Sequence, residues 1–298
     1  MRLVTFRVGK LPARPGALAD GGRSVVELPA PSVLAIVEGG AAALERAAAT
    51  LGRPPREAVF PLGEVTLLAP IPQPPQMRDF LCFEKHLRQS FEAIAKMRGT
   101  EARIPKVWYE RPIFYHPNRF NVCGSGAEVP WPAYCENLDF ELEFGCYIGQ
   151  PGKDIETARA REHIFGYTIF NDFSARDEQT RDMMGQLGPG KGKDFDNSNA
   201  MGPCLVTADE LEDPYNLEMK VRVNGEEWGR GHSSDMHWKF EDCIAHVSRS
   251  ETLHPGEFFG SGTVGNGCGL EHMKFLKPGD VVELEVEGIG VLRNRVVK

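Results

Sequence analysis

The sequence predicts a β-rich α+β protein with a small N-terminal α/β domain over residues 1–70 and a larger domain over residues 71–298. Three observations lead to this prediction. Gly (32) and Pro (22) are frequent, which is typical of strands joined by turns. A Pro-rich connector spans residues 70–75 and separates the two parts. Extended apolar segments then dominate the remaining chain, which is long enough to bury a large core.

The N-terminal part contains short apolar or alternating runs that predict strands or strand-like pieces. They are residues 1–8, 23–28, 33–37 and 65–68. One segment is different, because residues 41–51 are rich in Ala, Leu, Glu and Arg and are followed by Gly52. That composition predicts a helix with a glycine stop.

The C-terminal part begins with one helix and continues mainly as strands. Phe83, Leu87, Phe91 and Ile94 recur at helical spacing, which predicts an amphipathic helix over residues 83–98. Apolar or alternating segments predict strands over residues 138–148, 164–173, 217–223 and 281–286. Turn signals such as Asn-Gly at 224–225 separate them.

The charge balance and the cysteines exclude several classes of protein. The formal net charge of −8 argues against binding to nucleic acid or to an anionic membrane. No apolar run approaches the roughly 20 residues of a membrane helix, and residues 1–7 do not resemble a signal peptide, so we expect a cytoplasmic protein. The seven cysteines are scattered without a C-x-x-C pair, which argues against a disulfide framework or a structural zinc site.

Carboxylates recur where predicted strands could bring them together. Glu141 and Glu143 fall on one face of a strand, where they repel each other unless they are hydrated or share a cation. Asp172 directly follows a strand that is apolar on both faces, which would deliver it to a cavity mouth. Oxygen ligands of this kind favour Mg²⁺, Ca²⁺ or Mn²⁺. The alternatives are a half-exposed strand for the two glutamates and a turn or cap for Asp172.

Asp79 and His86 lie before and within the predicted helix. His86 flanks the apolar stripe, so it is either a buried core residue or, beside a metal, a general base. Lys193 follows a glycine-rich segment that fails the P-loop pattern. This lysine could neutralise a carboxylate or an enolate, or it could belong to a flexible surface loop. Residues 260–265 read G-x-G-x-x-G but lack a following helix, so we expect a tight backbone loop near a ligand and not a dinucleotide site.

In this order and spacing, these segments resemble the fumarylacetoacetate hydrolase superfamily over about residues 70–298. The motifs that carry the resemblance are residues 138–143, 163–166, 171–177 and 261–265. The resemblance implies a mixed β-sandwich roll for the C-terminal domain, a homodimer, a small oxo-acid substrate and a divalent metal. Mg²⁺ is the first expectation, with Mn²⁺ or Ca²⁺ as alternatives.

The resemblance also implies roles for individual residues. His86 matches the catalytic histidine, and Glu271 matches the glutamate that orients it. Lys193 matches a substrate-contacting position after an offset of one residue, and we expect it to act in catalysis by stabilising an enolate. The implied metal ligands are Asp79, Glu141, Glu143 and Asp172. The implied substrate contacts are Tyr115, Arg176, Gln179 and Thr263.

The expected reaction is metal-dependent hydrolysis of a carbon–carbon bond in a 1,3-dicarbonyl compound, such as a 2,4-dioxo acid, an acylpyruvate or a fumarylacetoacetate-like acid. Acylpyruvase and decarboxylase members often carry a glutamate three positions after the histidine, where this chain has Gln89. We therefore expect His86 and Glu271 to activate water. Two alternatives stay open: decarboxylation, isomerisation or hydration of a 2-oxo acid at the same site, and a non-catalytic binding protein.

Overall fold

A long mixed sheet is the centre of the molecule. The computed structural model describes residues 1–99 and 101–298, with the side chains at 97 and 98 left out. Within this part of the chain, twelve strands form the large sheet. They are β1 Arg2–Arg7, β2 Arg14–Ala19, β3 Ser24–Glu27, β4 Val59–Pro61, β5 Thr66–Leu68, β6 Met77–Phe80, β7 Phe114–Tyr115, β8 Val122–Cys123, β11 Leu142–Ile148, β12 Ile164–Asp172, β14 Asn199–Thr207 and β17 Phe258–Gly260. The order is β4-β3-β2-β1-β14-β12-β11-β17-β6-β7, with β5 on β1 and β8 on β14.

A five-stranded sheet packs against the large sheet. Its strands, in sheet order, are β16 Glu226–His232, β15 Glu218–Val223, β18 Val281–Val286, β19 Gly290–Val297 and β9 Glu128–Pro130. Every second residue of β15 and β18 is buried, as expected for strands with one face on a core. Ile169 and Val206 of the large sheet share that core with Val221, Leu284 and Leu292 of the smaller one. This arrangement confirms the predicted β-rich α+β fold.

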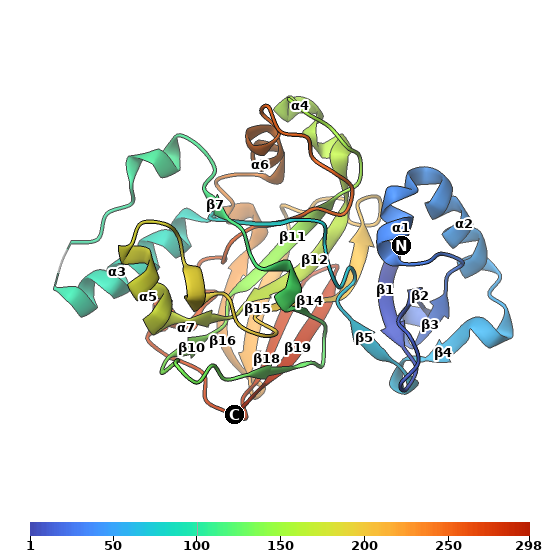
Figure 1. Ribbon diagram of the computed structural model, residues 1–298, viewed down its shortest axis with the longest axis horizontal. Coiled ribbons are helices and arrows are strands. Elements are labelled where there is room, and N and C mark those ends of the chain that lie inside the picture. The colour runs from blue at the N-terminus through green and yellow to red at the C-terminus, as the bar shows by residue number, and fades with distance from the viewer. Residues whose placement is uncertain (100) are drawn as a thin grey trace.

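The N-terminal strands continue the large sheet of the C-terminal part. Strand β1 pairs antiparallel with β14, with Leu3 opposite Leu205, so the hydrogen-bond ladder crosses from one part to the other. The helices of this part are α1 Val33–Glu38 and α2 Gly40–Gly52, which lie together at one end of the molecule in Figure 1. The domain boundary near residue 70 stays a prediction.

The expected strand-like piece at residues 33–37 is wrong, because this segment forms helix α1. The Ser32 side chain accepts a hydrogen bond from the Ala35 backbone N–H at 3.0 Å, which is an N-cap. Strand β2 was not predicted, since its Pro15 and Gly16 are residues that strands usually avoid.

The remaining helices form two groups around the sheets. Helices α3 Glu84–Arg98, α5 Arg176–Met184 and α7 Gly269–His272 lie on the side away from the N-terminal strands, whereas α4 Thr157–Ala160 and α6 Phe240–Val247 lie together at the top of Figure 1. Helix α3 confirms the predicted amphipathic helix, and Gly99 ends it with a φ of 65°. The first group surrounds the site described below.

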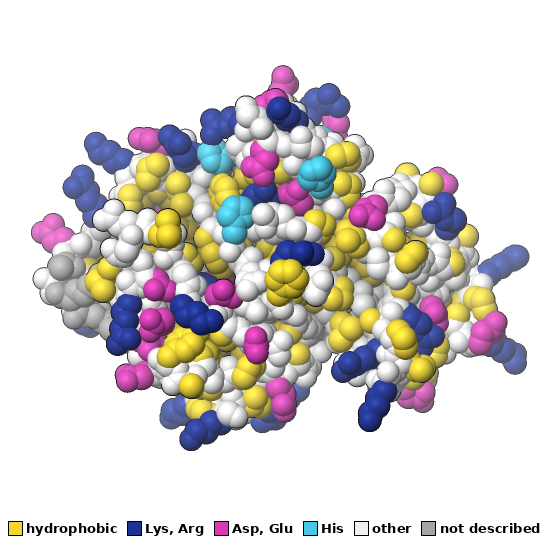
Figure 2. Space-filling model, in the orientation of Figure 1, with side chains coloured by type: hydrophobic (Ala, Val, Ile, Leu, Met, Phe, Trp, Pro, Cys, Tyr) yellow, Lys and Arg dark blue, Asp and Glu magenta, His cyan; other side chains and the backbone are white. Residues whose placement is uncertain are grey.

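The surface carries both signs of charge. On the face shown in Figure 2, dark blue basic and magenta acidic side chains are interspersed without a continuous basic area. This agrees with the net charge of −8. Among the described residues, no helix is both long and apolar enough to cross a membrane.

Candidate active site

A cavity of about 250 Å³ lies between α3, α5 and the end of the large sheet. Most of the residues singled out in the sequence line it: Asp79, His86, Tyr115, Glu141, Glu143, Arg176, Gln179, Lys193 and Thr263. The other two lie behind this lining, where Asp172 contacts Tyr115 and Lys193, and Glu271 contacts His86. The volume is below the roughly 300–1,000 Å³ of drug-sized sites, so the cavity suits a small molecule.

Two glycines of the 260–265 loop let the backbone approach Asp79. Strand β6 pairs in parallel with β17, so that Asp79 lies opposite Gly260. A Cβ atom at Gly260 would lie 2.4 Å from Asp79 Oδ1. Gly262 has a φ of +72°, and its N–H donates to Asp79 Oδ1 at 3.2 Å. The G-x-G-x-x-G segment is thus the tight loop expected beside the site.

The segment expected as one strand over residues 138–148 is interrupted before Glu143. Its first two residues form β10 (Leu138–Asp139), which pairs with β13 (Ser174–Ala175), and its last seven form β11, which pairs with β12. Glu141 lies in the interruption, and its N–H donates to Asn171 Oδ1 at 3.0 Å. Glu141 is 5% exposed and Glu143 is fully buried, so the alternative of a half-exposed strand is wrong.

Three buried carboxylates form a cluster at the inner end of the cavity. Oxygen atoms of Asp79, Glu143 and Asp172 all lie within 4.8 Å of one another. Burial, with the nearby charge of Asp172, raises the pKa of Asp79 to about 8. Burial and the charge of Asp79 raise the pKa of Glu143 well above its ordinary value. The cluster therefore resists carrying three negative charges unless a positive charge joins it.

The donor set of this cluster fits a hard divalent cation. Glu143 Oε2 and Asp172 Oδ1 are buried and have no hydrogen-bond partner among the described residues. Unpartnered buried carboxylate oxygens are costly, and a bound cation would satisfy them. Oxygen-only ligands are those that Mg²⁺, Mn²⁺ and Ca²⁺ prefer. The cluster can thus hold a divalent metal ion.

Glu141 is paired with protein cations and is not part of this cluster. Lys193 Nζ donates to Glu141 Oε2 at 2.5 Å and to Asp172 Oδ2 at 2.6 Å, and Arg176 Nη2 lies 2.8 Å from Glu141 Oε1. Burial opposes ionisation of Glu141, but Lys193 and Arg176 prevail and lower its pKa below the ordinary value. Lys193 is itself only 5% exposed, so the alternative of a flexible surface loop is wrong. That Glu141 binds the metal stays a prediction.

Asp139 is a buried acceptor that the sequence analysis did not single out. Its carboxylate accepts from Arg176 Nε at 2.8 Å and from the backbone N–H groups of Gly269 and Leu270 at 2.7 and 2.9 Å. It thereby joins Arg176 to the first residues of α7, the helix that carries Glu271. The sequence feature that could have identified Asp139 is its position two residues before Glu141, in the same acidic motif.

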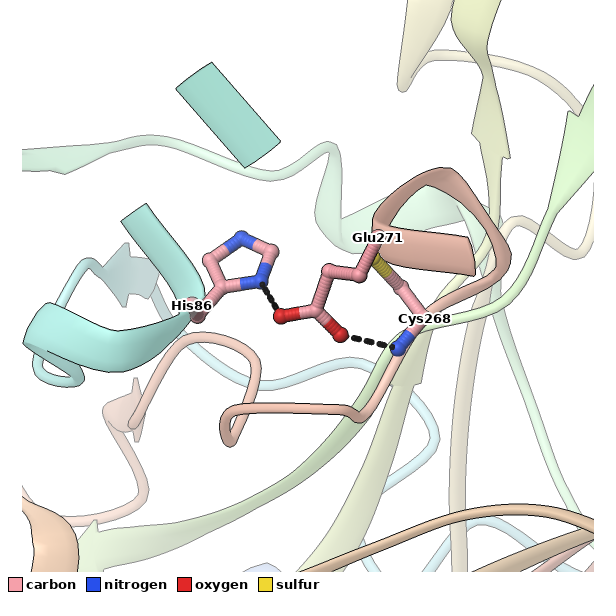
Figure 3. A group of neighbouring side chains, drawn as sticks. All are labelled: His86, Cys268 and Glu271. Carbon is pink, nitrogen blue, oxygen red and sulfur yellow. Dashed lines mark hydrogen bonds and ion pairs between the residues drawn. The ribbon is translucent and has the colours of Figure 1, made fainter. Parts of the chain in front are cut away.

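His86 and Glu271 form a hydrogen-bonded pair (Figure 3). His86 Nδ1 lies 3.0 Å from Glu271 Oε1, and Glu271 Oε2 accepts from the Cys268 backbone N–H at 3.0 Å. A carboxylate partner favours the tautomer with the proton on Nδ1. The second ring nitrogen, Nε2, points away from Glu271 in Figure 3 and is left as a proton acceptor. This geometry suits a general base.

The predicted substrate contacts adjoin the carboxylates. Tyr115 Oη donates to Asp172 Oδ2 at 2.6 Å, Thr263 Oγ1 donates to Glu143 Oε1 at 3.3 Å, and Arg176 Nη1 donates to Gln179 Oε1 at 3.0 Å. The four predicted contacts, Tyr115, Arg176, Gln179 and Thr263, line the cavity, and their contact with a substrate stays a prediction.

Gln89 stands where some family members carry a glutamate, and its side chain is hydrogen-bonded to Asn266 and not to His86. Its Nε2 donates to Asn266 Oδ1 at 2.7 Å, and its Oε1 accepts from the Asn266 N–H at 3.1 Å. Gln89 therefore links α3 to the loop before α7 and is not among the residues that line the cavity.

Comparison with known proteins places this chain among related enzymes. The family profile described as "Fumarylacetoacetate (FAA) hydrolase C-terminal" matches residues 76–297. The human protein "Oxaloacetate tautomerase FAHD2A, mitochondrial" is 34% identical over 100% of this chain and 92% of its own length. "Oxaloacetate tautomerase YisK" of Bacillus subtilis is 35% identical over 80% of this chain and 75% of its own.

Solved structures agree with this placement. The "5-carboxymethyl-2-hydroxymuconate delta-isomerase" of Mycobacterium smegmatis has a TM-score of 0.74 at 27% identity, covering 100% of this chain and 99% of that one. The fumarylacetoacetate hydrolase of Exiguobacterium antarcticum has a TM-score of 0.79 at 25% identity, with the same coverage.

These relatives correct the expected reaction. Hydrolysis of a carbon–carbon bond was expected, but the similar curated proteins are named as tautomerases, and the Mycobacterium smegmatis structure is named as an isomerase. The physical reason for the error is that a carboxylate cluster and a histidine base serve proton transfer beside a carbonyl as well as they serve activation of water. The residues alone did not discriminate between the two reactions.

Proposed function

The chain belongs to the fumarylacetoacetate hydrolase family and is an enzyme of it, and from this premise we propose that it interconverts the keto and enol forms of a 2-oxo acid such as oxaloacetate. The observation that supports this most is the His86–Glu271 pair at 3.0 Å beside a buried carboxylate cluster. Keto–enol conversion needs a base at C3 and positive charge near the C2 oxygen, and this cavity offers both.

Asp79, Glu143 and Asp172 would hold the metal ion, and we propose Mg²⁺, with Mn²⁺ or Ca²⁺ as alternatives. When bound, the cation supplies Lewis-acid polarisation of the substrate's 2-oxo and carboxylate oxygens. Glu141 adjoins this cluster through Lys193, which contacts both Glu141 and Asp172. It is the candidate for a fourth ligand.

The proton is moved by His86. Its Nε2 takes the proton from C3 of the keto acid, and Glu271 stabilises the imidazolium that results. The electron pair of the C–H bond becomes the C2–C3 double bond, and the C2 oxygen gains negative charge. His86 then returns the proton to that oxygen, so that no atom is gained or lost.

Lys193 supplies positive charge from the protein. Burial opposes its charge, but Asp172 and Glu141 prevail and raise its pKa, so the side chain stays an ammonium. Two hydrogens of the ammonium group are donated to the Glu141 and Asp172 carboxylates. The nearest acceptor for its third hydrogen is the Asp172 backbone oxygen, which lies 3.5 Å from Nζ, farther than in an ordinary hydrogen bond. We assign this third hydrogen to the enolate oxygen. Arg176, Gln179, Tyr115 and Thr263 are the proposed contacts for the rest of the substrate.

We also propose a cytoplasmic homodimer whose partner is a small oxo acid and not a nucleic acid or a membrane. The net charge of −8 and the mixed charges of the face in Figure 2 support the absence of a polyanion partner. The dimer follows the resemblance to the family, and light scattering on the purified protein tests it.

Product analysis tests the proposed reaction. Oxaloacetate, prepared in its enol form, is mixed with the enzyme and Mg²⁺ and followed by NMR against the same buffer without enzyme, because metal ions alone catalyse enolisation. We expect faster appearance of the keto form with no other product. Carbon dioxide and pyruvate in proportion to enzyme would instead establish decarboxylation and overturn the proposal.

A further inference from the structure

Part of the cavity lining is apolar and is called the apolar wall. Phe91 and Ile94 of α3, Ile113 and Phe114 before and within β7, and Met183 of α5 line this wall. The charged residues Asp79, Glu143, Lys193 and Arg176 line the same cavity, but none of them lines a second cavity, which continues from Phe91, Ile94 and Met183. A molecule bound across the cavity would therefore meet charge at one end and hydrocarbon at the other.

The apolar wall continues outward into a second cavity. This cavity, of about 330 Å³, shares Phe91, Ile94, Thr180 and Met183 with the first, so the two are adjacent. Its further lining includes Ala95 and Met184, with Glu101 and Arg103 at its exposed rim. Both helices that form it, α3 and α5, lie on the same side of the sheets in Figure 1. There is thus room for a substituent longer than that of oxaloacetate.

Among the described residues, the apolar wall offers a second carboxylate no cationic partner. Among the described residues that line the inner cavity, the permanent cations are Arg176 and Lys193. Both are paired with carboxylates at the charged end, Arg176 with Asp139 and Lys193 with Glu141 and Asp172. A carboxylate placed against Phe91 and Ile94, which are partly buried, would lose part of its hydration without gaining a partner. An apolar group at the same place would bind favourably, because removing apolar surface from water lowers the free energy.

We propose that this enzyme isomerises 2-oxo acids that carry an aryl or branched-alkyl group at C3, with that group against Phe91, Ile94 and Met183. The inference rests on the proposed function. In the arylpyruvate enol the O–H bond at C2 breaks and a C–H bond at C3 forms, with the proton carried by His86. The C2–C3 double bond becomes the C2=O bond, so the step needs no oxidant, reductant or second reactant.

The test compares phenylpyruvate with oxaloacetate on the full-length enzyme with Mg²⁺, following loss of the enol by ultraviolet absorbance. We expect kcat/KM for phenylpyruvate to equal or exceed that for oxaloacetate. A lower value for phenylpyruvate, with oxaloacetate still isomerised, overturns this inference alone. Failure to isomerise either acid overturns the proposed function as well.

Charge-introducing variants locate the substituent. Met183→Lys, at a half-exposed position that tolerates charge, should lower kcat/KM for phenylpyruvate at least tenfold relative to that for oxaloacetate, and Ile94→Lys should do the same. The matched control is Glu92→Lys on the exposed side of α3, which should leave the ratio unchanged. Affinity for benzoylformate, which cannot enolise, gives a readout independent of turnover and should fall in the two cavity variants. An unchanged substrate ratio in a folded Met183→Lys protein contradicts the placement.

Discussion

His86 Nδ1 and Glu271 Oε1 lie 3.0 Å apart although 185 positions separate the two residues in the chain. The histidine comes from the first turn of α3 and the glutamate from the short helix α7. Glu271 is held by the Cys268 N–H, and the link from Gln89 to Asn266 ties α3 to the loop that leads into α7. The pair is therefore assembled by the fold before a substrate arrives, which is what efficient proton transfer requires.

Replacing His86 tests the proposed base. His86→Ala should lower kcat for keto–enol conversion by about 10²-fold or more, the usual scale for loss of a general base. The stabilisation by Mg²⁺ should persist, because His86 is not one of the clustered carboxylates. Steady-state kinetics and thermal unfolding measure the two effects. A variant within a few-fold of the wild-type kcat would show that another group moves the proton.

Asp139→Asn tests the buried link between Arg176 and α7. The amide side chain no longer carries the negative charge that lies 2.8 Å from Arg176 Nε. It also has one acceptor oxygen in place of two, so the Gly269 and Leu270 N–H groups are no longer both satisfied. Loss of one partner of a buried ion pair costs about 3–5 kcal/mol. Denaturant unfolding should show a decrease of this size in the free energy of unfolding, together with a lower kcat. Unchanged stability would mean that the Arg176 charge is satisfied elsewhere.

The contribution of Asp79 to the stability of the metal-free protein should decrease as the pH rises from 3.8 to about 8. The pKa of Asp79 is raised to about 8 in the folded protein, chiefly by burial, against 3.8 ordinarily. Between these values the folded state holds a proton that the unfolded chain has released, so the free energy of unfolding falls with increasing pH. Mg²⁺ favours the ionised cluster and should therefore raise the Tm more at the upper end of this range. Calorimetry with EDTA or Mg²⁺ measures this, and a Mg²⁺ effect that is independent of pH would contradict it.

Glu143→Gln should have opposite effects on the metal-free and metal-loaded protein. Removing one of the three carboxylates relieves their repulsion, so the Tm with EDTA should rise by about 2 °C, equivalent to roughly 1 kcal/mol in a chain of this size. The same change removes an oxygen ligand, so stabilisation by Mg²⁺ should decrease sharply. Glu92→Gln makes the same chemical change on the exposed side of α3 and should alter neither value. An undiminished Mg²⁺ effect in Glu143→Gln would place the cation elsewhere.

Local patterns were enough to predict much of the fold. The helical spacing of Phe83, Leu87 and Phe91 predicted α3, and the alternation over residues 281–286 predicted β18, because each pattern reports a single buried face. The segment at residues 33–37 was misjudged because the capping hydrogen bond that the Ala35 N–H donates to the Ser32 hydroxyl, and not its apolar content, decides its structure. The acidic motifs and their order were likewise sufficient to identify the family.

The detail of the site depends on contacts that the sequence does not display. Lys193 reaches Glu141 across 52 positions and also contacts Asp172, so it connects Glu141 to the three clustered carboxylates. Asp139 lies 130 positions from Gly269, whose backbone N–H donates a hydrogen bond to its carboxylate. The reaction itself was misjudged for a different reason, since the same base and carboxylates can activate water or remove a proton beside a carbonyl.

The most direct test of the central claim is the exchange of hydrogen at C3 of oxaloacetate for deuterium in heavy water, followed by NMR. The wild-type enzyme with Mg²⁺ should incorporate deuterium at C3 faster than buffer with Mg²⁺ alone, and both EDTA and His86→Ala should remove that excess. If the wild-type rate equals the buffer rate, or if His86→Ala retains the excess, then His86 does not transfer a proton at C3 and the account given above is contradicted.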